Sequence, residues 1–243
     1  MSGTPIVDWT YCASADCIVS GIYNWQTLIG GLVAIGAAWY AGRVVRGQIK
    51  AAAGQETVRY NRRLNAVRSL LPLTLSGMSD YARNAAVCLM GAVLGFRLLE
   101  GQEQTPQITP PDVPGDLVTQ IAAMIEATDD VNVIRMLRKM IGEVQVLNSR
   151  MQGLQMELEL EPVGPRQALL QNIDIYLLQC AVIYAQCSAM FEFARFEADT
   201  VPESLPWEEV FTAFAVMRVR EYEYPRLFEF CARAREEGRN PES

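Results

Sequence analysis

Histidine is absent from all 243 residues of the sequence. Its absence removes the side chain most often used as a general base, a proton shuttle or a neutral nitrogen ligand for metals. Ser-His-Asp and Cys-His catalysis are therefore excluded in their usual forms. The Glu-x-x-His pairs of a di-metal carboxylate bundle are missing for the same reason.

Other local patterns of a catalytic or cofactor site are also missing. None of the six cysteines forms a CxxC pair, which argues against a zinc site. No glycine-rich phosphate loop follows a strand, and no segment reads convincingly as a strand. The glutamate pairs at 208–209 and 236–237 lie in charged surroundings and do not suggest a paired-carboxylate site. We therefore expect a non-enzymatic protein without metal or cofactor.

Positive charge is missing from the N-terminal part of the chain, where the first basic residue is Arg43. A cleaved signal peptide has its positive charges before its apolar run, so this segment does not fit one. Residues 43–68 then hold seven basic side chains and one acidic side chain. The positive-inside rule predicts a cytoplasmic location for the chain after residue 45, with the tail of residues 1–21 outside.

A long apolar stretch lies just before these basic residues and predicts a transmembrane helix over residues 22–45. Residues 28–42 carry no charged or strongly polar side chain. Their length as a helix is about 22 Å, less than the roughly 30 Å of a bilayer core, so flanking side chains must extend the span. The predicted interface residues are Trp25, Trp39, Tyr40, Arg43, Arg46 and Lys50. The alternative is a buried core helix of a soluble protein.

Small residues repeat every four positions in this stretch, at Gly30, Ala34, Ala38 and Gly42. They fall along one side of a helix, where two membrane helices can approach closely. This pattern predicts a homo-oligomer, although glycine and alanine are also common in membrane helices without any such role.

Cys12 and Cys17 precede the apolar stretch, and the predicted topology places them in an oxidising compartment. They can form a disulfide with each other or with a second chain, or remain thiols in the tail. The sequence leaves these alternatives open.

Charge changes sign along the rest of the chain. The segment 46–72 predicts a basic juxtamembrane helix that lies against anionic lipid head groups. Residues 69–243 hold fourteen basic and twenty-five acidic side chains. Since phosphate binding requires a basic surface, this acidic part argues against nucleic acid as a partner.

Helical periodicity and proline turns predict an all-α protein, with an antiparallel cytosolic bundle over residues 73–243. The segment 73–99 contains an apolar run too short to span a bilayer and predicts a core helix, with a second span as the alternative. A proline-rich loop is expected at 101–115. The further helices are predicted at 116–127, 130–160, 166–199, 206–217 and 225–237.

The segment 130–160 has the clearest periodicity and is typical of a bundle or coiled-coil helix. Its predicted seam contains Ile134, Leu137, Ile141, Val144, Met151 and Leu158, with Asn148 and Gln155 as two polar members. Val133, Met140, Leu147 and Leu154 widen the apolar stripe on one side. A second row, Asn172, Gln179 and Gln186, predicts a solvated or inter-helix edge of side-chain amides, with a sequestered polar channel as the alternative.

Ten of the twenty-one aromatic residues lie within residues 191–230. Aromatic side chains dominate both cores and interaction surfaces. Most of these are expected to pack the two terminal helices onto the long helices, and the alternative is a docking surface.

Three segments resemble uncharacterised single-pass bacterial membrane proteins. They are the anchor WQTLIGGLVAIGAAWYAGRVVRGQIKAA, the segment RSLLPLTLSGMSDYA, and WEEVFTAFAVM followed by YPRLFEF. The resemblance implies an inner-membrane location in a bacterium and an all-helical fold, and it implies no activity.

Two functions follow as hypotheses. The first is a membrane-anchored scaffold or interaction protein whose cytosolic bundle binds a partner or itself. The alternative is a membrane-active effector or signalling subunit that acts through assembly of its transmembrane helix.

Overall fold

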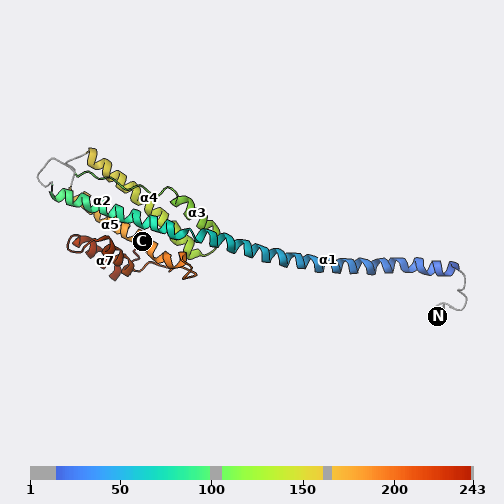
Figure 1. Cartoon of the computed structure of the whole chain (residues 1–243). Coiled ribbons are helices and arrows are strands. Elements are labelled where there is room, and N and C mark those ends of the chain that lie inside the picture. The colour runs from blue at the N-terminus through green and yellow to red at the C-terminus, as the bar shows by residue number, and fades with distance from the viewer. Residues whose placement is uncertain (1–14, 99–105, 161–165, 242–243) are drawn as a thin grey trace, which may run out of the picture. The chain divides into compact units, whose positions relative to one another are not determined.

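A computed structural model of the chain describes residues 15–98, 106–160 and 166–241, and its regular elements there are all α-helices (Figure 1). These are α1 (Ala15–Arg68), α2 (Leu71–Leu98), α3 (Leu117–Ala127), α4 (Val131–Leu160), α5 (Arg166–Ala194), α6 (Trp207–Met217) and α7 (Pro225–Glu236). No strand occurs in the described ranges. The predicted all-α fold class is confirmed, and most helices begin and end within two residues of the predicted positions. Two predictions are wrong: α1 begins at Ala15, inside the predicted tail, and α5 ends at Ala194 and not at residue 199.

The chain divides into two compact units, Met1–Arg59 and Tyr60–Ser243. We call the second the C-terminal unit. Its boundary lies within α1, since Leu64 and Val67 near the end of that helix pack against the buried core of the C-terminal unit. The end of the predicted juxtamembrane segment therefore belongs to the core-forming part of the chain.

The break between α1 and α2 is a short turn at residues 69–70, and Pro72 is the second residue of α2. A proline has no N–H to donate, so it is tolerated in the first turn of a helix and disfavoured in the interior. The observed break lies within a few residues of the predicted boundary between the segments 46–72 and 73–99.

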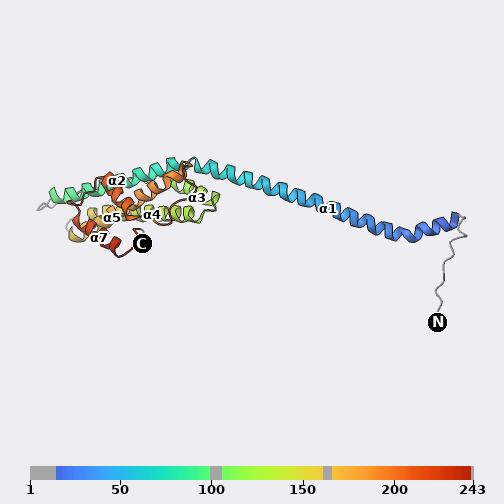
Figure 2. The same ribbon diagram turned by 90° about the horizontal axis from the view of Figure 1, so that it is seen from below.

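Helix α5 is the central element of the C-terminal unit and packs against α2, α4, α6 and α7. Figures 1 and 2 show α2, α4 and α5 side by side, with α5 returning along the other two. The buried face of α2 is rich in small side chains, which allow helix axes to approach closely. These buried small residues are Ala82, Ala85, Ala86 and Ala92.

The predicted loop after α2 crosses that helix closely. A Cβ atom added to Gly95 would lie 2.6 Å from the Cβ atom of Pro106. Gly95 is therefore needed for contact with the loop, whereas Gly91, four residues earlier on the same helix, has open space around it. The segment 73–99 is a core helix, as expected, with a dozen buried residues.

The buried line of α4 matches the predicted stripe in part. The buried residues are Val133, Met136, Leu137, Met140, Val144, Leu147, Met151, Leu154 and Leu158. Ile134 and Ile141 are only half-buried, and so are Asn148 and Gln155. Four members of the predicted seam, namely Leu137, Val144, Met151 and Leu158, are therefore buried together with the predicted flanking line from Val133 to Leu154, and the two polar residues lie at the edge of the buried face.

The amide row of α5 is neither one solvated edge nor one channel. Asn172 is exposed, whereas Gln179 and Gln186 are buried. Gln179 links α5 to α4, since its side-chain amide donates to the backbone oxygen of Glu143 at 3.1 Å and to its carboxylate at 2.6 Å. Arg150 in turn donates to the amide oxygen of Gln179 at 3.0 Å.

The C-terminal aromatic residues pack mainly inside the C-terminal unit, as expected. Rings of α6 and α7 form a cluster in which Phe214 and Phe228 have centroids 5.1 Å apart, within the range for favourable aromatic pairs. Three of the ten remain exposed, namely Phe196, Tyr222 and Phe230.

Helix α4 begins at Val131, one residue after the predicted start at 130. The Asp130 carboxylate accepts hydrogen bonds from the backbone N–H groups of Asn132 at 2.8 Å and Val133 at 3.1 Å, as an N-cap does. Burial raises the pKa of this carboxyl, but these bonds and one from Thr200 outweigh it and lower the pKa overall.

We predict that Leu137→Asp destabilises the C-terminal unit by several kcal/mol, because it places an unpaired charge in the core. Leu137 and Ile183 are both fully buried. The measurement is thermal unfolding of the full chain in lipid nanodiscs, followed by circular dichroism. Val146→Asp, on the same helix at a side chain 43% exposed, is the matched control. Equal melting temperatures for the two variants would contradict the packing described here.

Candidate functional site

Two helical regions are long and apolar enough to cross a membrane. The first begins at Leu28, and none of its apolar window is buried. The second is Leu169–Ala194 in α5, and 61% of its window is buried inside the C-terminal unit. The two stretches have similar composition, but only α5 has its apolar side chains covered by the rest of the chain.

The predicted membrane residues all lie on the uninterrupted helix α1. Exposed fractions are 61% for Trp25, 65% for Trp39 and 66% for Tyr40. The guanidinium of Arg43 lies 5.7 Å from the centre of the Trp39 ring, so the cation covers part of the indole. Arg46 and Lys50 follow on the exposed helix surface.

The predicted association strip is open in the single chain. Nothing in the described chain would contact a Cβ atom at Gly30 or Gly42, and Ala34 and Ala38 are exposed. The disulfide prediction cannot be followed, since Cys12 and the side chain of Cys17 lie outside the described residues. The four remaining cysteines are free thiols. Burial raises the pKa of Cys187 and Cys231 to about 12, so these thiols are not poised as nucleophiles.

Arg68 is a buried, hydrogen-bonded arginine that the sequence analysis did not single out. It is the last residue of α1, it is only 7% exposed, and burial lowers its pKa while Asp199 opposes the shift. Its Nε donates to the backbone oxygen of Phe193 at 2.6 Å, and Nη2 donates to the backbone oxygen of Ala198. One side chain therefore satisfies carbonyl groups at the C-terminal end of α5.

Two phenyl rings complete the Arg68 site. The guanidinium carbon lies 4.0 Å from the ring centre of Phe193 and 4.4 Å from that of Phe196. Phe196 has a φ of 64°, a left-handed conformation that costs an L-residue about 1–2 kcal/mol. It ends α5 as a helix C-cap, and the N–H of Glu197 donates to the oxygen of Glu192. Stacking against Arg68 offsets part of this cost.

Exposed contacts join the preceding turns of α1 to the α3–α4 region. Arg63 and Glu126 form an ion pair at 3.1 Å, and the hydroxyl of Tyr60 accepts from the N–H of Asp129 at 3.2 Å. Surface ion pairs contribute little to the free energy of folding. Arg68 is therefore the main polar contact between the end of α1 and the rest of the C-terminal unit.

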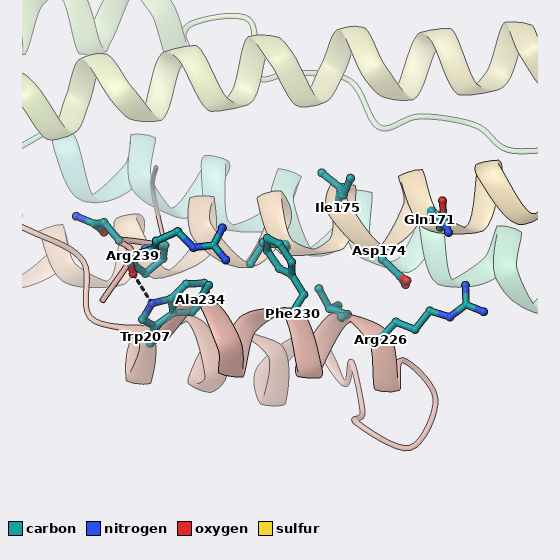
Figure 3. A pocket seen from close by; sticks show the side chains of 12 residues that line it. Gln171, Asp174, Ile175, Trp207, Arg226, Phe230, Ala234 and Arg239 are labelled. Carbon is teal, nitrogen blue, oxygen red and sulfur yellow. Dashed lines mark hydrogen bonds between the residues drawn. The ribbon is translucent and has the colours of Figure 1, made fainter. Parts of the chain in front are cut away.

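A cavity of about 460 Å³ lies between α5 and α7 (Figure 3). Its walls are mainly apolar, and Ile175 of α5 and Phe230 of α7 remain 52% and 43% exposed. The volume and the apolar lining are those of ligand sites in proteins. The apolar lining is Ile175, Leu178, Trp207, Leu227, Phe230, Ala234 and Pro241.

Charged groups lie at the two ends of this cavity (Figure 3). Asp174 and Arg226 are at one end; burial raises the pKa of Asp174, and Arg226 opposes that shift. Arg239 is at the other end, where its guanidinium lies 5.7 Å from the ring centre of Phe230. The backbone oxygen of Arg239 accepts from the indole N–H of Trp207 at 2.8 Å.

A second cavity of about 420 Å³ continues along α5 towards α4. It shares Ile175, Leu178 and Pro241 with the first cavity, so the two cavities are neighbours along α5. We call the two cavities together the α5 groove. Its α4 side is lined by Lys139, Gly142, Glu143, Val146 and Arg150.

The last residues of the described chain are positioned by the end of α7. Gly238 has a φ of 67°, and the N–H of Arg239 donates to the oxygen of Ala234 at 2.9 Å. This is a Schellman-type helix end, which turns the chain back over the preceding helix. Pro241 reaches the α5 groove because of that turn.

Sequence signals for both sites exist in retrospect. Leu64, Val67 and Leu71 have helical spacing, so the sequence indicates an apolar face close to Arg68 along the chain. In α5, Ile175, Leu178 and Val182 form a second apolar line beside the predicted one. A helix with apolar residues on two faces needs more cover than one neighbour provides.

Among the described residues, no group of three or more Cys, Asp or Glu side chains could hold a metal ion. No protein-family model, curated protein or solved structure matches the chain.

We predict that Arg68→Lys lowers the free energy of unfolding of the C-terminal unit by about 1–3 kcal/mol. Lysine keeps the charge but loses the planar stacking and the second directed hydrogen bond. Urea unfolding of the full chain in nanodiscs measures the change. Arg63→Lys, at an exposed ion pair, is the control and should change stability by less than about 0.5 kcal/mol. A larger loss for the Arg63 variant would show that Arg68 is not the main polar contact.

Proposed function

We propose that this chain is a non-enzymatic, single-pass membrane protein whose C-terminal helical bundle binds a protein partner through the α5 groove. The observation that carries the membrane part is the fully exposed apolar run of α1, flanked by Trp25 and then by Arg43 and Arg46. Transfer of that run from water into a bilayer removes a large apolar area from water. The observation that supports partner binding is the α5 groove, with its mainly apolar walls.

The proposed orientation has the N-terminal tail outside and the bundle in the cytoplasm. It rests on the seven basic residues that follow the apolar run, beginning at Arg43. The resemblance to single-pass bacterial membrane proteins supports the inner membrane as the location. Lipid is then a permanent partner of α1, and its head groups lie beside the basic residues at the cytoplasmic end of the span.

Binding in the groove is supported by the shape and the chemistry of the cavity walls. Ile175 and Phe230 expose apolar area on facing helices, and Arg226 and Arg239 lie at the ends of the cavity between them. Apolar centres with polar rims are typical of binding surfaces, and exposed scattered apolar residues are not.

A second candidate function is a membrane-active effector or signalling subunit that assembles through α1. The strip formed by Gly30, Ala34, Ala38 and Gly42 favours it, because the strip is uncovered in the single chain. Close helix approach along such a strip stabilises dimers in membranes. Self-association of α1 is also compatible with the first function, since a dimer presents two grooves.

Fusion of a reporter after Ser243 tests the orientation. We predict that a phosphatase active only in the periplasm is silent there, and that a fluorescent protein that matures in the cytoplasm is bright. The physical reason is the excess of basic residues after the apolar run. Phosphatase activity without fluorescence would reverse the proposed topology.

Site-specific photo-cross-linking in the native cell tests partner binding. A photoreactive residue in place of Ile175 should give a discrete adduct in the full chain, because this position lies in the α5 groove. The matched control is the same residue in place of Val87, which is 61% exposed on α2. Phe230→Glu should abolish the adduct at position 175. The absence of an adduct at 175, or equal adducts at both positions, would contradict the groove as the docking site.

A further inference from the structure

A short segment that follows α7 lies on the α5 groove. Pro241 lines both cavities of the groove, and so do Ile175 and Leu178 of α5. Residues common to both cavities lie where the two meet, so Pro241 is next to the exposed apolar line of α5. Arg239 and Asn240 line the first cavity as well. We call residues 238–241 the strap.

The direction of the strap is determined by its first residue. Gly238 has a φ of 67°, a left-handed conformation that glycine adopts readily and that other residues disfavour. The N–H of Arg239 donates to the oxygen of Ala234 at 2.9 Å and closes the turn at the end of α7. The strap therefore reaches the groove only while residue 238 keeps this conformation.

Arg239 fixes the strap near the groove through three contacts. Its backbone oxygen accepts from the indole N–H of Trp207 at 2.8 Å (Figure 3). Its guanidinium lies 5.7 Å from the ring centre of Phe230 and forms an exposed ion pair with Glu237 at 2.6 Å. Exposed ion pairs and exposed cation–π contacts contribute little. The hydrogen bond from Trp207 is therefore the main polar contact of Arg239.

The strap is packed less firmly than the helix that precedes it. Helix α7 buries Leu227, Cys231 and Ala234 in the core. In the strap, Gly238 and Arg239 are exposed, and the two residues that follow are half-buried. Segments with few buried apolar contacts open locally at a small cost in free energy. The strap can therefore leave the groove while α7 stays in place.

We propose that the strap is an autoinhibitory segment, which covers part of the α5 groove and must leave it before the protein partner binds. This inference rests on the proposed function, because it names the regulation of that docking site. A partner that packs on Ile175 and Leu178 needs the space next to them, which Pro241 occupies. The apparent affinity for the partner is then reduced by the fraction of chains whose strap is open.

Hydroxyl-radical footprinting tests whether the strap covers the groove. The full chain and a chain that ends at Gly238 are oxidised in phosphatidylcholine nanodiscs, and mass spectrometry measures the rate at each side chain. Leu178 and Phe230 should be oxidised at least about twofold faster in the shortened chain, because their cover is removed. A chain that ends at Pro241 keeps the strap and is the control.

Val87, which is 61% exposed on α2, serves as the internal reference for the oxidation rate. Melting temperatures check that the shortened chains are folded. Equal rates at Leu178 and Phe230 in the full and shortened chains would overturn the inference, because the strap would then cover nothing.

A point variant opens the strap without removing it. No atom lies within 4 Å of a Cβ atom added at Gly238, so Gly238→Ala acts through its backbone conformation alone. Alanine disfavours a φ of 67°, and the ratio of open to closed strap should rise by about fivefold to tenfold. Gly153→Ala is the matched control, since it also adds a Cβ atom in open space but lies within the regular helix α4.

Photo-cross-linking at position 175 in the native cell then measures the competition. Gly238→Ala and the chain that ends at Gly238 should each raise the yield of the partner adduct by about threefold or more. Gly153→Ala should change the yield by less than about twofold.

The outcomes separate the inference from the proposed function. An unchanged or lower adduct yield in the chain that ends at Gly238 would overturn the inference and leave the groove as a docking site. A lower yield together with faster oxidation of Leu178 would show that the strap is part of the docking surface. Absence of the adduct in every chain, including the shortened one, would overturn the proposed function and the inference together.

Discussion

The burial of α5 is the constraint on which the C-terminal unit depends. This helix contacts α2, α4, α6 and α7, and it contributes fully buried residues along most of its length, from Ile173 to Met190. A helix that is apolar on most sides must be covered by protein or by lipid. Four neighbouring helices provide that cover here, and the α5 groove is a place where the cover is incomplete.

The helix pattern was predictable because local signals determine it. Proline and glycine turns and the 3.6-residue period gave the ends of α4 and α7 within a few residues. The buried face of α4 was predicted only in part, because a line through Ile134 and a line through Val133 both have helical spacing, and the line through Val133 is the one that is fully buried. Only the position of the neighbouring helices decides which line is buried, and the sequence does not contain that position in readable form.

The sites were less predictable than the helices, for the same physical reason. Arg68 was included in a solvated basic helix, yet it is buried between two phenyl rings from a segment more than a hundred residues later. The position of the groove depends on the space that remains between α4, α5, α7 and the end of the chain. Helix α5 therefore carries two features: its C-terminal end receives Arg68 from the last turn of α1, and its exposed line at Ile175 forms the groove floor.

Membrane extraction tests most directly the central claim that α1 is the membrane helix and α5 is a core helix. The full chain and a chain of residues 60–243 are expressed separately, and their membranes are washed with alkaline carbonate. The account predicts that the full chain stays in the membrane pellet. The shorter chain should appear in the supernatant, with helical circular dichroism and a cooperative melt. Recovery of the folded shorter chain in the carbonate-washed pellet would contradict the account, because α5 would then be a membrane helix.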